Sequence, residues 1–353
     1  MTFLLTLVVF ILILGLLIFV HEFGHFIIAK RTGVKVLEFA FGFPPRIFSW
    51  KRQETTYSIN AIPVGGYVKM LGEDGQNNAP NSFSKKKVPT RLAIVFAGVF
   101  FNFLLTIVLL AIGFSIGMSP IVSKADSFSG EKIHNILVVQ IEKDSPAQKV
   151  GIQSGEMILG FKNAADFQNF TQAHKGETIS LAMKKAGRTR NISVLLSQSS
   201  EAPLGVGMVE DVKVKLPFYK AIVAATAETG KITWAIIKFL GIFFKNIFVS
   251  GKVSQDVTGP VGVFSFVSSA IDLGLVYVLQ LTALLSINLA LINILPFPAL
   301  DGGRILFIAL EGVRGKKVIR AEIENIIHLV GFAILILLIL AITYRDIIRF
   351  VVR

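Results

Sequence analysis

The chain has 353 residues, of which 53% are hydrophobic and 17% are charged, with a formal net charge of +13 and no cysteine. A soluble domain carries about 25% charged residues, so the composition argues against a purely soluble protein, and the apolar content excludes intrinsic disorder. A disulfide framework and a cysteine-bound metal are excluded as well. In so apolar a chain, the positive charge is more typical of membrane flanks than of a nucleic-acid surface, so we expect no nucleic-acid partner.

Four segments are apolar enough to cross a bilayer as helices, which takes about 20 residues with few charges. They are residues 1–20, 92–123, 273–300 and 325–344. The first segment lacks a basic start and a cleavage site of small residues, so it is interpreted as a retained helix and not as a signal peptide. The expected fold class is a polytopic α-helical membrane protein with four transmembrane helices.

The loop between the first two segments is strongly basic. From Lys30 to Arg91 it contains eleven Lys or Arg residues against four acidic ones. The positive-inside rule places this loop in the cytoplasm and the N-terminus outside. By parity the C-terminus and the long segment 124–272 are also outside, and the ends of the first and third helices meet near the cytoplasmic side.

The first helix ends in His21-Glu22-Phe23-Gly24-His25. Two histidines four positions apart lie on one helical face, so both imidazoles can bind one metal ion, and the intervening Glu is placed to act as a base. Ionisable groups in a membrane segment are costly and usually functional, although a polar end-cap is the alternative. A catalytic zinc takes three protein ligands and leaves the fourth position to water, so a third ligand is required.

Asp301 is the candidate for the third ligand. It follows the segment NILPFPAL, residues 293–300, at the expected cytoplasmic end of the third helix. The two prolines of this segment break the helix, and the two glycines after Asp301 permit a tight turn beside an ion. An N-terminal cap of a following helix is the alternative role. We predict one Zn²⁺ per chain, bound by His21, His25 and Asp301.

Together these motifs resemble the site-2 protease family of intramembrane zinc metalloproteases, and most closely the bacterial regulator-of-sigma-E-protease type. The resemblance includes FGFPPR (residues 41–46), IPVGGYVKM (62–70), which is similar to the membrane-associated β-loop of the family, and GPVG (259–262). Phe43 departs from the family pattern, which has Gly there. The resemblance implies a metalloendopeptidase of a bacterial inner membrane that hydrolyses peptide bonds within transmembrane segments, with Glu22 as the general base.

Candidates for substrate binding follow from the same resemblance. Asn293 would hydrogen-bond the substrate backbone or the developing oxyanion, with Asn288 as a second possibility, although helix–helix hydrogen bonding is the alternative for both. Residues 57–70 alternate in polarity and predict a β-hairpin or re-entrant loop after a strand at 34–41. Its edge could accept an unwound substrate as an extra strand, or it could be a cytosolic hairpin without that role. The candidate contact residues in it are Gly65, Gly66 and Tyr67.

The exported segment has an ordinary soluble composition up to about residue 212. Strands are predicted at residues 136–141, 157–161, 178–183 and 191–196. Residues 145–156, SPAQKVGIQSGE, resemble the signature of PDZ domains, with Glu156 where Asp is commoner. The resemblance implies one inserted α+β PDZ domain that captures peptide C-termini by strand addition, and a spacer without peptide binding is equally open.

Lysines alternate with apolar residues at helical spacing in the region that follows. This pattern predicts an amphipathic helix on the outer membrane surface and not a fifth span. The predicted organisation is helix one with the metal motif (1–30), the β-loop region (31–91), helix two (92–120), the PDZ domain (121–212), the amphipathic region (213–256), helix three (257–303), a cytoplasmic loop (304–324), and helix four with the tail (325–353).

The expected partners are the lipid bilayer, membrane-tethered substrates of the anti-sigma-factor type, signal-peptide remnants, and a peptide C-terminus at the PDZ domain. A metal-ion transporter and an inactive PDZ membrane scaffold are the alternative functions. A transporter needs polar residues along several helices, but helices two and four offer chiefly Asn102 and His328. An inactive scaffold should have lost one of the four metal-site residues, and all four are present.

Overall fold

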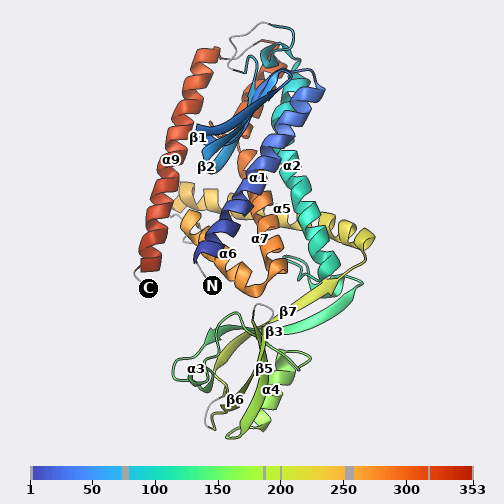
Figure 1. Cartoon of the computed structure of the whole chain (residues 1–353), viewed down its shortest axis with the longest axis vertical. Helices are drawn as coiled ribbons and strands as arrows, with labels where there is room; N and C mark the ends of the chain where they lie inside the picture. The colour runs from blue at the N-terminus through green and yellow to red at the C-terminus, as the bar shows by residue number, and fades with distance from the viewer. Residues whose placement is uncertain are drawn as a thin grey trace. The chain divides into compact units, whose positions relative to one another are not determined.

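The structure is a computed structural model that describes residues 3–73, 79–185, 188–198, 201–250, 258–316 and 319–351 (Figure 1). The chain divides into two compact units. One unit contains residues 108–232 and 266–281, and the other contains residues 2–107, 233–265 and 282–353. We call them the sheet unit and the metal unit, and each is described by itself.

Four helices in the described part of the chain are long and apolar enough to cross a membrane, as predicted. They are α1 (Phe3–Arg31), α2 (Val88–Ile116), α7 (Leu275–Asn293) and the part Glu322–Ile348 of α9 (Ala321–Val351). Protein covers less than half of the most apolar stretch of each helix, and in α9 it buries only 6% of that stretch. Such surface is unfavourable in water and suits lipid, while the helical backbone satisfies its own hydrogen bonds.

The region predicted as helix three (257–303) is divided into more elements than the sequence predicts. α6 (Pro260–Leu273) ends at Gly274, whose φ is +114°, and α7 then runs only to Asn293. The segment 294–300 is a turn with two prolines, which cannot donate helical hydrogen bonds. The prediction that Asp301 ends the third helix is therefore wrong. Asp301 is the first residue of α8 (Asp301–Arg314).

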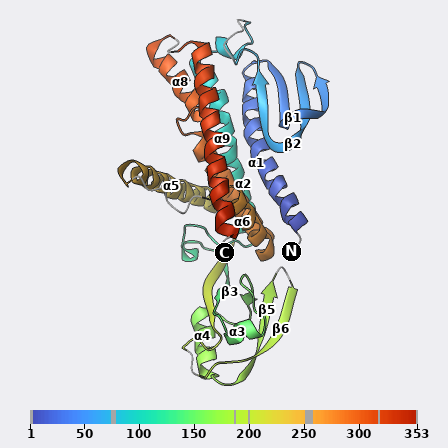
Figure 2. The same cartoon turned by 90° about the vertical axis from the view of Figure 1, so that its left-hand side faces the viewer.

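A β-sheet lies along α1 in the metal unit (Figure 2). It is formed by β1 (Val36–Arg52) and β2 (Thr55–Met70), so the strand predicted at 34–41 continues to Arg52. The strands fold back on themselves, and Phe39 pairs with both Val68 and Tyr57. The tip of the sheet exposes large apolar side chains, which are Phe43, Ile47, Phe48, Trp50, Ile59 and Ile62.

Helices α1 and α2 approach each other closely because glycines lie between them. A Cβ atom on Gly24 would be 2.5 Å from the carbonyl oxygen of Ala97. Small residues of this kind allow the backbones of membrane helices to touch. A buried cluster beside this contact joins α1, the sheet, the short helix η1 (Phe83–Lys85), α2 and α8; its members are Ala29, Val34, Val36, Val68, Met70, Phe83, Ile94, Val95 and Ile308.

The sheet unit contains a five-stranded sheet with the order β6-β5-β4-β3-β7. Its strands are β3 (Glu131–Ile141), β4 (Met157–Ile158), β5 (Thr178–Lys185), β6 (Arg188–Leu195) and β7 (Val206–Lys215). The short helices η2 (Ala125–Ser127), α3 (Pro146–Lys149) and α4 (Ala164–Ala173) belong to the same unit. The sequence predicts four of the strands, and β7 was not among them.

The amphipathic pattern after the sheet forms one long helix, α5 (Phe218–Ser250). Residues 251–256 of the predicted region lie outside the described residues. Glu228 of α5 is fully buried, and its Oε1 accepts hydrogen bonds from the backbone N–H groups of Ile121, Val122 and Ser123 at 2.8, 2.6 and 3.1 Å. The carboxylate thus fixes the segment that leaves α2.

Candidate metal centre

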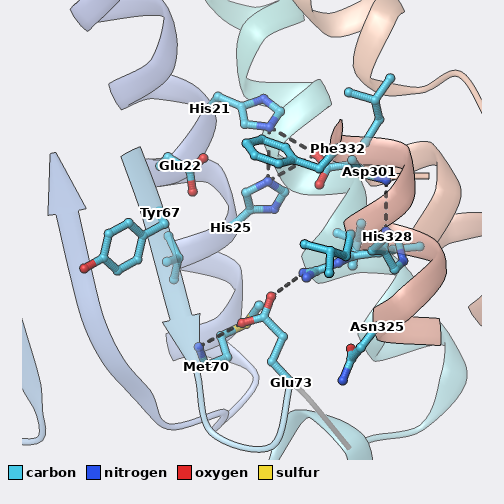
Figure 3. A pocket seen from close by; sticks show the side chains of 16 residues that line it. His21, Glu22, His25, Tyr67, Met70, Glu73, Asp301, Asn325, His328 and Phe332 are labelled. Atoms are coloured by element: carbon cyan, nitrogen blue, oxygen red, sulfur yellow. Dashed lines mark hydrogen bonds and ion pairs between the residues drawn. The ribbon is translucent and has the colours of Figure 1, made fainter. Parts of the chain in front are cut away.

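Three side-chain atoms from α1 and α8 converge in the metal unit (Figure 3). Nε2 of His21 lies 3.0 Å from Oδ2 of Asp301, and Nε2 of His25 lies 3.3 Å from the same oxygen. The two Nε2 atoms are 3.3 Å apart. All three side chains are largely buried, and residues 276 positions apart in the sequence are brought together.

The local sequence explains how each ligand atom arrives there. His21 and His25 are one helical turn apart on α1, so their side chains point to one side. Asp301 is in the first turn of α8 because the prolines before it end the preceding helix. A carboxylate at the start of a helix, beside two imidazoles, is able to bind a cation.

The spacing of these atoms fits a metal ion. Zinc binds imidazole nitrogen and carboxylate oxygen at about 2.0–2.2 Å, so the edges of a tetrahedral zinc site are about 3.3–3.5 Å long. The three edges here are 3.0, 3.3 and 3.3 Å. Among the described residues, Oδ2 of Asp301 is also buried without a hydrogen bond of acceptable geometry. Acceptor atoms packed so closely repel one another unless a proton or a metal ion lies between them.

The other ring nitrogens of both histidines have partners. Nδ1 of His25 donates to the carbonyl oxygen of Ile94 at 2.9 Å, which leaves the lone pair of Nε2 free for a metal. Nδ1 of His21 lies 3.3 Å from the amide nitrogen of Asn102, whose own oxygen Oδ1 is buried and has no partner in the described part of the chain. If the oxygen and nitrogen of the Asn102 amide are exchanged, Oδ1 accepts a hydrogen bond from Nδ1–H of His21. The lone pair on Nε2 of His21 is then free for a metal, as it is in His25, so we assign that orientation.

Gly98 of α2 forms the wall against which the imidazoles pack. A Cβ atom there would be 2.4 Å from Nε2 of His25 and 2.7 Å from Cε1 of His21. Gly66 of β2 packs in the same way against Glu22, the predicted base: a Cβ atom added to Gly66 would be 3.2 Å from Cγ of Glu22. The absence of two side chains therefore creates the room that the centre occupies.

The three atoms border a pocket of about 500 Å³. Glu22, His21, His25 and Asp301 line it, together with Tyr67 of β2, whose hydroxyl points away from the histidines in Figure 3. The pocket is also lined by Arg304 and Glu73, which form an ion pair, and Oε2 of Glu73 accepts from the N–H of Met70 at 3.2 Å. A polar cavity thus adjoins the three metal-binding side chains, two of which lie in the C-terminal part of the apolar helix α1.

Three of the predicted substrate residues lie elsewhere. Asn288 donates through Nδ2 to the carbonyl oxygen of Leu284 in its own helix at 3.0 Å, and neither it nor Asn293 lines the pocket. Gly65 packs against the ring of Phe43: a Cβ atom added to Gly65 would be 2.1 Å from that ring. The substrate contacts predicted for these residues stay predictions.

The structure adds residues to the site that the two metal-binding motifs do not include. His328 and Asn325 of α9 line the pocket, and Gly98 and Asn102 of α2 support the histidines. The signal available in the sequence was the presence of Asn102 and His328 within apolar helices, since polar groups at membrane depth are costly and usually functional. Nothing in the sequence indicates that Gly98 faces the histidines.

Comparisons with known proteins agree with this geometry. The profile of Peptidase family M50 matches residues 9–338. A protein of Clostridium acetobutylicum, whose name assigns it provisionally to the zinc metalloproteases, is 34% identical over 97% of each chain. Zinc metalloprotease RasP of Oceanobacillus iheyensis is 30% identical over 98% of this chain and 99% of its own length, and that of Geobacillus kaustophilus is 28% identical over 97% of each. The chain therefore belongs to Peptidase family M50, the site-2 protease family, and is a zinc metalloprotease with membrane-spanning helices.

Proposed function

We propose that this zinc metalloprotease is an intramembrane endopeptidase that cuts peptide bonds within the transmembrane segments of membrane-tethered proteins. The observation that carries the proposal is the convergence of His21, His25 and Asp301 within 3.3 Å of one another, with both histidines in the C-terminal part of an apolar helix. Hydrolysis at membrane depth requires a cavity that admits water, and the pocket of about 500 Å³ beside these atoms supplies one.

The three metal-binding residues and Glu22 would have distinct roles. His21, His25 and Asp301 would hold the zinc ion, which lowers the pKa of a bound water to about 7 and polarises a carbonyl group. Glu22 lines the same pocket and would accept the proton of the attacking water and deliver it to the leaving amine. A donor set of two imidazoles and one carboxylate leaves the fourth position of a catalytic zinc open.

The substrate would bind as an extended strand, because a helix buries its carbonyl groups in its own hydrogen bonds. The β-sheet of the metal unit supports this role: Tyr67, Val68 and Met70 of β2 line the metal pocket. An unwound transmembrane segment could pair with this strand beside the zinc. The exposed aromatic and aliphatic side chains at the tip of the sheet would lie in lipid.

The sheet unit would act as a single PDZ domain. β7 is an edge strand, and a groove of about 310 Å³ lies between it and α4, lined by Phe167, Thr171, Leu204 and Met208. A free strand edge beside a helix is the arrangement that captures an extended chain end by strand addition. A peptide C-terminus produced by an earlier cut would suit this groove.

The protein would lie in the inner membrane of a bacterium with both termini and the PDZ domain outside the cytoplasm. The basic loop between α1 and α2 supports this orientation. The active site would then be near the cytoplasmic side, and α5 would lie on the outer membrane surface. Membrane-bound anti-sigma factors and leftover signal peptides are the proposed substrates.

The test is cleavage of a single-span model substrate by the purified protein in lipid nanodiscs. Glu22→Gln should keep bound zinc and the parent's folding but lose cleavage by at least about 100-fold, the range in which general acid–base catalysis acts. His134→Gln, on an exposed part of β3, is the control and should cleave like the parent. Undiminished cleavage by Glu22→Gln would refute the proposed function.

A further inference from the structure

His328 of α9 lies in the wall of the metal pocket, although no motif includes it (Figure 3). Its Nδ1 accepts a hydrogen bond from the backbone N–H of Ala299 at 3.0 Å. Its ring also meets that of Phe307 edge-on, with the ring centres 5.9 Å apart. The imidazole is therefore held in one orientation by Ala299, which precedes Asp301, and by Phe307 of α8.

This hydrogen bond determines where the proton of the ring lies. Nδ1 can accept only if it carries a lone pair, so the neutral ring carries its hydrogen on Nε2. Nε2 is buried and has no hydrogen-bond partner among the residues that the structure describes. A buried donor without a partner costs free energy. The pocket that His328 lines is also lined by Glu22 and by the three metal-binding residues.

Helix α9 makes a second contact with the same turn. A Cβ atom on Gly331 would be 2.5 Å from Cβ of Pro298 and 2.6 Å from its carbonyl oxygen. Gly331 is three residues after His328, so both lie on one face of the helix. Ala299, between Pro298 and the metal-binding carboxylate, has a φ of +80°, a conformation that non-glycine residues adopt only when their surroundings hold them.

We propose that His328 has two roles, which rest on the proposed function. Through Nδ1 it positions the segment from Ala299 to Asp301, and through Nε2–H it donates a hydrogen bond to a backbone carbonyl oxygen of the bound substrate. An unwound peptide presents free carbonyl groups, and a donor-only N–H in a sheltered pocket is complementary to them. Arg304, another donor in the lining, is already paired with Glu73.

Three substitutions separate the two roles. In His328→Asn, the side-chain oxygen can take the place of Nδ1 and accept from Ala299, but the donor to the substrate is lost. In His328→Gln, the longer side chain can place its N–H near the position of Nε2 while the link to Ala299 is lost. His328→Phe keeps the ring and loses both hydrogen bonds.

The experiment measures zinc affinity by competition with a chelator, and KM and kcat with a single-span substrate in nanodiscs. We expect zinc affinity to fall about 10-fold in the Gln and Phe variants and to stay close to that of the parent in the Asn variant, as for residues that support a metal ligand. We expect KM to rise about 10-fold in the Asn and Phe variants and to change little in the Gln variant, because a ground-state contact is lost. His134→Gln is the matched control.

An unchanged zinc affinity and KM in His328→Phe would overturn the inference, while cleavage that still depends on Glu22 would leave the proposed function intact. If all three variants showed the same fall in zinc affinity, the same rise in KM and the same fall in thermal stability, the role of His328 would be purely structural. That result would also overturn the inference. A parent protein that binds no zinc and cuts no substrate would instead contradict the proposed function itself.

Discussion

The imidazoles of His21 and His25 are packed against the backbone of Gly98, so one added methyl group should disturb them. In Gly98→Ala, the new Cβ would meet Nε2 of His25 at 2.4 Å and would push both rings out of line. We expect zinc affinity to fall about 10–100-fold, measured by chelator competition. Gly241→Ala on α5 is the control, because its Cβ would meet nothing within 4 Å. Equal zinc affinities in the two variants would contradict the close packing.

Asn102 is the other single residue on which the centre depends. Its amide is within hydrogen-bond distance of Nδ1 of His21 and it is completely buried. Asn102→Leu keeps the branching of the side chain and removes the hydrogen bond, so we expect about a 10-fold weaker zinc affinity. The exposed Asn191→Leu of β6 should have no effect on zinc. Full zinc affinity in Asn102→Leu would show that the hydrogen bond does not orient His21.

The sequence predicts the metal-binding side chains better than it predicts their neighbours. His21 and His25 share a helix, so their spacing alone places them together, and Asp301 is identified by the break before it. Gly98 and His328 reach the site from separate helices. Their contacts depend on how the helices rotate and cross, which a single sequence does not determine.

Glu228 shows how one carboxylate can connect two elements. It is fully buried on α5 and accepts from three consecutive backbone N–H groups after α2. Glu228→Ala removes these charge-assisted hydrogen bonds, which should destabilise the segment locally by about 2–3 kcal/mol. Amide hydrogen exchange at residues 121–123 should then speed up about 100-fold, whereas the exposed Glu131→Ala should leave it unchanged. Unaltered exchange in Glu228→Ala would refute the role.

Helices and strands were predicted with unequal success for physical reasons. Apolar runs identify α1, α2 and α9, because hydropathy directly reports what lipid requires. The break at Gly274 was not predicted, and the helix break that the sequence assigns to the two prolines begins earlier, after Asn293. β7 was not predicted because its residues, VGMVEDVKVK, span the boundary assigned between the soluble domain and the amphipathic region.

The orientation of the whole molecule can be tested because the chain has no cysteine. Single cysteines at Lys143 and Lys87, both exposed, would lie on opposite sides of the membrane. In intact cells we expect a membrane-impermeant maleimide to label Lys143→Cys and not Lys87→Cys, because the basic loop is retained inside. Disrupted cells, in which both should react, provide the control. Labelling of Lys87→Cys in intact cells would reverse the proposed orientation.

At the scale of the whole chain, the close contact between His25 and Asp301 spans 276 positions. The sequence predicts this contact, because helix parity brings the ends of α1 and α7 to the same side of the membrane. It predicts the proline break before the carboxylate, but it gives the start of a following helix, where the structure has Asp301, only as an alternative. The pocket and its α9 wall likewise depend on packing among distant segments.

The central claim is that His21, His25 and Asp301 together bind the zinc of this metalloprotease. Elemental analysis of the purified parent and of four variants tests it most directly. We predict about one zinc per chain in the parent and in Glu22→Gln, and almost none in His21→Ala, His25→Ala or Asp301→Ala, because two ligands do not hold the ion. Zinc retained at the parent's level in any of the three ligand variants would contradict the account.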